Sequence, residues 1–113
     1  MNKQNKTVLI TGASRGLGAN FAKVLTNDGF QIIGVGRNTK HLEDVFSNLP
    51  NPQLNHHFFK VDITNDTEVN QKLSGLNIYG LVNNAGIANT KLLHADPKMY
   101  QNDPYRISFL IRS

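Results

Sequence analysis

Short apolar runs alternate with amphipathic stretches along most of the chain. The runs are rich in β-branched residues and each is closed by a glycine or a polar residue, a pattern typical of buried strands. The expected strands are residues 7–11, 31–36, 57–61 and 78–82. Between them, apolar side chains recur at the spacing of one helical face. The expected helices are residues 16–27, 39–49 and 64–75.

Capping residues predict where these helices begin and end. Gly29 suits the C-cap of the first helix, because glycine adopts the left-handed conformation easily. Thr39 is the expected N-cap of the second helix, which Pro50 closes. Either Thr64 or Asn65 caps the third.

The order of elements indicates an α/β fold. Strands that alternate with helices imply right-handed crossovers and a parallel sheet. We therefore expect a three-layer, Rossmann-like, doubly wound sheet, truncated after about four strands in the order 3-2-1-4. The loops that follow strands one and four then flank one crevice, where ligands bind in such folds.

Composition fits one globular domain over residues 1–113, with 39% apolar and 18% charged residues. The absence of cysteine excludes disulfides and thiolate metal sites, fits a reducing compartment and makes the cytoplasm the expected location. No stretch is apolar for long enough to suggest a secretory signal or a membrane span.

Charge and histidines suggest two other functions, neither of which is favoured. The net charge is +4, but the basic residues are scattered, whereas nucleic-acid binding usually requires a cluster. Adjacent His56 and His57 would point to opposite faces of a strand, so no metal site is expected.

The glycine-rich stretch TGASRGLG, Thr11 to Gly18, lies between the first strand and the first helix. Gly12 permits a sharp turn, Gly16 lets the backbone approach a ligand, and Gly18 allows the helix to pack closely on the strand. The free N–H groups of the helix would then bind a pyrophosphate. Three glycines alone also fit an ordinary tight turn, but their place in a β-α-β unit predicts a dinucleotide.

The end of the second strand predicts which dinucleotide. NAD binding usually requires a carboxylate there, but this chain has Gly36 followed by Arg37. Arg37, with Arg15 of the glycine loop, could bind a 2′-phosphate, which favours NADP(H); two solvated surface arginines are the alternative. Asp62, after the third strand, is either an acceptor for the adenine amino group or a turn aspartate.

These residues resemble the short-chain dehydrogenase/reductase family from about Lys6 to Tyr100. The motif T-G-x-x-x-G-x-G matches Thr11–Gly18, and N-N-A-G matches Asn83–Gly86. Asp62-Ile63 matches the family's adenine-contacting pair. The cofactor-binding residues that spacing and resemblance together imply are Gly12, Ser14, Arg15, Gly16, Leu17, Gly18, Arg37, Asp62, Ile63, Asn84, Ala85 and Gly86.

The resemblance implies hydride transfer between NADP(H) and a carbonyl or alcohol substrate, with a serine and a Tyr-x-x-x-Lys motif for the proton. None of the three tyrosines is followed four residues later by lysine; those positions hold Asn83, Pro104 and Phe109. We therefore name no catalytic residue and expect no turnover from these residues alone. A non-catalytic dinucleotide-binding or interaction module, completed by a second chain, is the alternative.

Residues 101–113 depart from the family pattern, which suggests a truncated chain whose last dozen residues come from a shifted or prematurely closed reading frame. Without further strands, the fourth strand would be an exposed apolar edge, prone to aggregation or self-association. The apolar tail 107–111 is a candidate to cover that edge.

Overall fold

The computed structural model describes residues 6–13, 16–83 and 107–110 of the 113-residue chain. The strands are β1 (Thr7–Thr11), β2 (Gln31–Gly36), β3 (His57–Lys60), β4 (Gly80–Asn83) and β5 (Ile107–Leu110). The helices are α1 (Gly16–Asn27), α2 (Thr39–Ser47), the 3-10 turn η2 (Pro52–Leu54) and α3 (Asp66–Leu73).

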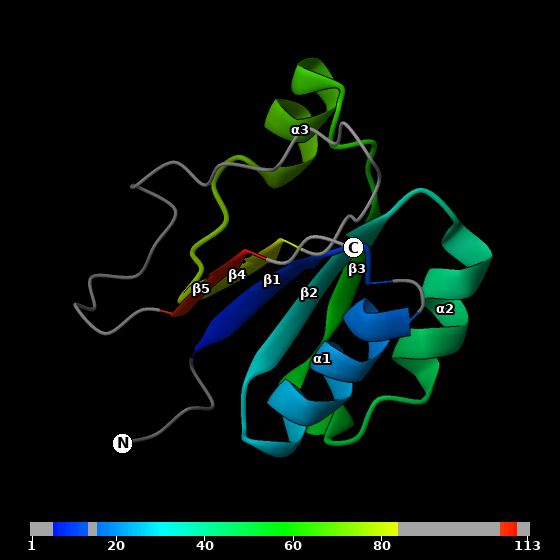
Figure 1. The fold of residues 1–113 in the computed structure, drawn as a ribbon, viewed down its shortest axis with the longest axis vertical. Helices are drawn as coiled ribbons and strands as arrows, with labels where there is room; N and C mark the ends of the chain where they lie inside the picture. The colour runs from blue at the N-terminus through cyan, green and yellow to red at the C-terminus, as the bar shows by residue number, and fades with distance from the viewer. Residues whose placement is uncertain (1–5, 14–15, 84–106, 111–113) are drawn as a thin grey trace.

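These strands form one sheet in the order β3-β2-β1-β4-β5, and every pair is parallel (Figure 1). The first four follow the predicted order 3-2-1-4. Helices α1 and α2 pack on one face and α3 on the other, which confirms the three-layer, doubly wound α/β fold.

The fifth strand corrects the prediction of an exposed β4. Residues Gly80 to Asn83 pair in register with Ile107 to Leu110, so β4 lies inside the sheet. The apolar tail had been the candidate to cover the edge of β4. As strand β5 it supplies the backbone hydrogen-bond partners that an edge strand lacks. Self-association through an exposed β4 therefore loses its structural basis.

Several element boundaries differ from the expected ones. Asn38, and not Thr39, is the N-cap of α2: its backbone is extended and its side-chain oxygen accepts from the His41 N–H at 3.0 Å. Asn65 caps α3 in the same way, accepting from the Glu68 N–H at 3.1 Å. Gly29 follows α1 with a φ of 98°, as expected for a C-terminal glycine. The remaining shifts are small: α2 ends at Ser47, α3 at Leu73, β3 at Lys60, and β4 begins at Gly80.

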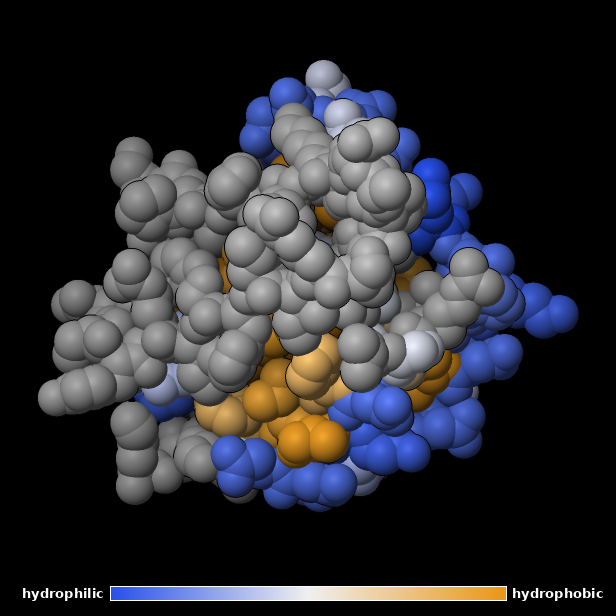
Figure 2. Space-filling view, viewed as in Figure 1, coloured by the Kyte–Doolittle hydropathy of each residue, from blue (hydrophilic) through white to orange (hydrophobic). Residues whose placement is uncertain are grey.

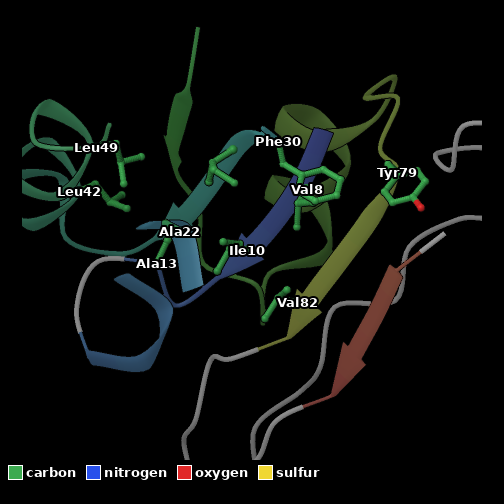
Figure 3. Close-up of a cluster of buried hydrophobic side chains, with 10 residues drawn as sticks. Val8, Ile10, Ala13, Ala22, Phe30, Leu42, Leu49, Tyr79 and Val82 are labelled. Atoms are coloured by element: carbon green, nitrogen blue, oxygen red, sulfur yellow. The ribbon is translucent and has the colours of Figure 1, made fainter. Parts of the chain in front are cut away.

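Two apolar clusters hold the layers together, one on each face of the sheet. The first joins Val8 and Ile10 of β1 to Ala22 of α1 and Leu42 of α2 (Figure 3). The second joins Leu9, between those two β1 residues, to Leu73 of α3 and to apolar residues of β2 and β4. Because successive strand residues point to opposite faces, one apolar strand serves both clusters.

The surface contrasts with this interior. The rim beside α2 is largely hydrophilic, while apolar residues show near the centre of the same view (Figure 2). Within the described part of the chain, Val24 is the one large apolar side chain that is clearly exposed, at 63%. In that same part, no helix is long and apolar enough to cross a membrane.

His56 connects α1, β2 and the loop after α2. Its Nδ1 accepts from the Ile32 N–H at 3.0 Å, so the ring proton is on Nε2. Nε2 lies 2.8 Å from Thr26 Oγ1 and 3.1 Å from the Pro50 carbonyl oxygen. Burial lowers the pKa of His56 from 6.5, and the charge of His57 lowers it further, against the raising effect of backbone hydrogen bonds.

This network predicts acid sensitivity. A second proton on His56 would displace the Ile32 N–H, and the unfolded chain takes that proton at higher pH than the folded one. Stability is therefore unaffected well above pH 6.5 and falls as the pH drops through 6.5 toward the lowered folded pKa. Denaturant unfolding between about pH 8 and about pH 5 should show a steeper loss for the natural chain than for His56→Gln. Equal slopes would contradict this prediction.

Candidate functional site

The glycine-rich stretch turns sharply where β1 meets α1. Gly12 and Gly16 both have a φ of 63°, in the left-handed region that side chains disfavour. The N–H of Ala13 donates to the Val35 carbonyl at 3.2 Å, which holds the start of the loop against β2. Gly18 is buried in α1. The first two glycines are therefore required by the backbone itself.

The start of α1 suits an anion. Apart from its chain neighbours and the backbone of its own helix, no heavy atom of the described residues lies within 4 Å of the position a Cβ would take on Gly16, so this position faces open space. The first turn of α1 has no acidic side chain, and α1 is 12 residues long. Free N–H groups and the positive end of the helix dipole together favour a phosphate.

The ends of β2 and β3 bring two charged residues together. The Val61 N–H donates to the Gly36 carbonyl at 2.9 Å, which brings Arg37 and Asp62 near each other just beyond the ends of adjacent strands. Arg37 is exposed. Hydrogen bonds from Thr64 lower the pKa of Asp62, and the positive charge of Arg37 contributes to the same shift.

Asp62 takes the structural role that the sequence left open. One carboxylate oxygen accepts from the Thr64 hydroxyl at 2.6 Å and from the Thr64 N–H at 2.9 Å. This is an Asx turn leading into α3. The role as adenine acceptor stays a prediction. Ile63 is half-buried and packs against the apolar cluster around Leu9.

The end of β4 lies at the same edge of the sheet as the glycine loop. Thr11 Oγ1, at the end of β1, donates to the Val82 carbonyl at 3.5 Å, so the two strands end side by side. The end of β4 therefore lies beside the end of β1, where the glycine loop begins. Five predicted site residues lie outside the described residues: Ser14, Arg15, Asn84, Ala85 and Gly86. Leu17 belongs to α1.

Sequence reasoning missed one residue of this region, Gly34 in β2. A Cβ at that position would lie 2.8 Å from the Cβ of Ala13, in the glycine loop, and closer still to Phe46 of α2. An isolated glycine within an apolar strand was the available signal, because it often marks a close approach of another segment.

Tyr79 lies apart from the glycine loop. Tyr79 is the one tyrosine that the structure describes; it is buried, stacks on Phe30 at 5.7 Å and lies under the Lys6 ammonium. It is a core residue. Across the described ranges, no cluster of three potential metal ligands occurs.

Fold and site together define a Rossmann-type domain with a glycine-rich loop between its first strand and its first helix. The model of the short chain dehydrogenase family matches residues 6–107. The chain therefore belongs to the short-chain dehydrogenase/reductase family.

Individual relatives agree with this membership. The chain is 34% identical to a farnesol dehydrogenase of Aedes aegypti over 102 residues, 80% of this chain and 40% of the relative. It is 34% identical to a coniferyl-alcohol dehydrogenase of Pseudomonas over 107 residues, 93% of this chain and 36% of the relative. The crystal structure of a bulky-bulky ketone specific alcohol dehydrogenase from Comamonas testosteroni matches with a TM-score of 0.66 and 28% identity, covering 74% of this chain and 36% of that one. The chain thus spans about 40% of these relatives' length or less.

Proposed function

We propose that this chain is the NADP(H)-binding part of a short-chain oxidoreductase that transfers a hydride between NADP(H) and a carbonyl or alcohol substrate. The observation that carries the proposal is Arg37. It follows β2 where an NAD-binding chain would have a carboxylate, and it lies at the sheet edge that also holds the glycine loop.

Each part of this edge has a distinct role in the proposal. Backbone amides from Gly12 to Gly18 bind the pyrophosphate, assisted by Ser14. Arg37 and Arg15 bind the 2′-phosphate, because a guanidinium donates two parallel hydrogen bonds to phosphate oxygens. Asp62 and Ile63 flank the adenine. Asn84, Ala85 and Gly86 line the ribose and nicotinamide side.

When bound, the cofactor supplies or accepts the hydride, and the protein supplies position and electrostatics. The proton of the substrate oxygen needs a separate acid–base group. Because no Tyr-x-x-x-Lys motif occurs in these 113 residues, we propose that they bind cofactor without turnover. Carbonyl-dependent oxidation of NADPH by this chain alone, followed at the nicotinamide absorbance, would contradict that part of the proposal.

Arg37→Ala tests the choice of cofactor. We expect NADPH binding to weaken by about 10- to 100-fold, the value of one or two hydrogen bonds to a charged group, with NADH binding unchanged. Calorimetric titration of both dinucleotides measures the two dissociation constants. The natural chain should prefer NADPH.

Lys23→Ala is the matched control, since it removes one exposed positive charge from α1, away from the end of β2. It should leave both affinities within about twofold, because Arg37 would act by contact and not by net charge. Equal losses for NADPH and NADH in Arg37→Ala would show that the 2′-phosphate is not what Arg37 binds.

A further inference from the structure

Gly34 lies at a crowded point behind the glycine loop. It is buried in β2, with Ile10 of β1 on one side and Phe58 of β3 on the other. A Cβ on Gly34 would overlap Phe46 Cζ and lie 2.8 Å from the Cβ of Ala13. Cβ atoms hardly ever approach another heavy atom to less than 3.0 Å. Gly34 does not have a positive φ, so the position requires glycine for space and not for backbone conformation.

The two neighbours differ in how easily they can move. Phe46 meets Gly34 with the far end of its ring, which is only partly buried and packs against Phe58 at 5.5 Å between centroids. Rotation of this side chain could relieve the contact at small cost.

Ala13 has no such freedom. Its methyl group is fixed to the backbone, it is fully buried, and its N–H donates to the Val35 carbonyl at 3.2 Å, next to Gly34. A steric clash with the Ala13 methyl group would therefore act directly on the backbone at the start of the glycine loop, at Gly12 and Ala13. Figure 3 shows Ala13 among the side chains of the cluster that also includes Val8, Ile10 and Leu42.

We propose that Gly34 is a positioning residue for the dinucleotide-binding loop. The absence of a side chain at Gly34 lets Ala13 lie close to β2, and this close approach fixes the backbone of Gly12 and Ala13, where the glycine loop begins. Gly34 itself touches no cofactor. The inference rests on the proposed function, because it concerns how well the same loop binds a dinucleotide.

The test compares affinity and stability in four variants. Gly34→Ala should weaken NADPH binding about tenfold or more, since one charge-assisted hydrogen bond to phosphate is worth that factor. Adding Ala13→Gly removes the methyl group that Gly34→Ala would strike, so this double variant should regain most of the affinity. Adding Phe46→Leu instead relieves only the ring contact, so it should regain stability without affinity. Gly75→Ala, which places a side chain at a φ of 86° beyond α3, should lose stability alone.

Calorimetric titration with NADPH and denaturant unfolding give the two readouts. If Gly34→Ala alone does not fold, the two double variants are compared with each other and should still differ about tenfold in affinity. Natural affinity in Gly34→Ala would overturn the inference while leaving the proposed function intact. Equal NADPH affinity of the two double variants would also overturn the inference and leave the proposed function intact. Failure of the natural chain to bind NADPH or NADH would overturn both.

Discussion

Replacing Gly16 with aspartate is expected to weaken NADPH binding at least about 100-fold, or about 2.7 kcal/mol. The backbone at Gly16 faces open space, and in the proposed complex a phosphate would occupy it. A carboxylate there would block the approach and repel the anion. The fold should persist, because aspartate tolerates a positive φ better than most residues and acidic side chains are favourable at a helix N-terminus. Calorimetric titration measures the affinity, and circular dichroism checks the fold.

Two controls separate bulk, charge and place. Gly16→Asn has nearly the same shape without the charge, so it should retain more affinity than the aspartate variant. Gly75→Asp makes the same change at another glycine of positive φ with open space around it, far along the chain at the end of α3. It should bind NADPH as the natural chain does. If Gly16→Asp also binds normally, the phosphates do not lie at the start of α1.

Leu9→Ala should have the largest effect on stability, a loss of about 2 to 5 kcal/mol. Leu9 is fully buried in β1, between Ile33 of β2 and Leu81 of β4, and belongs to the cluster that α3 covers. Truncation would leave a cavity at the centre of the sheet. The total stability of such domains is about 5 to 15 kcal/mol, so much of the protein could unfold at mild denaturant concentrations. Urea unfolding at neutral pH measures the change.

Val24→Ala is the matched control, because it also removes methyl groups but from a side chain that is 63% exposed. It should change the free energy of unfolding by less than about 0.5 kcal/mol. A loss below about 1 kcal/mol for Leu9→Ala would show that the face of the sheet under α3 does not form a closed core.

The predicted elements were found because their signals are local. Apolar runs identified the first four strands, and Gly29 identified the end of α1. The error at the start of α2 has a simple cause. Asn38 and Thr39 are both good N-caps, and only the extended backbone of Asn38 shows which one serves.

Part of the candidate site could be predicted from the sequence for the same reason. The glycines of the loop and Arg37 stand at fixed distances from a strand, so spacing alone placed them at one edge. Spacing could not assign the role of Asp62, because an adenine acceptor and a turn aspartate would occupy the same position in the sequence. The hydrogen bonds from Thr64 to the Asp62 carboxylate are needed to identify the turn.

The amino-acid sequence by itself determined the alternation of strands and helices, the strand order of the first four strands and the glycine loop before α1. The alternation and the loop depend on periodicity and on backbone freedom, which are properties of neighbouring residues. The strand order follows from the right-handed crossovers that such alternation implies in a doubly wound sheet. Tertiary structure alone decided that residues 107–110 pair with β4, and that Gly34 meets Ala13 and Phe46. Such contacts join segments distant along the chain, so their distances exist only once the sheet and its helices have packed.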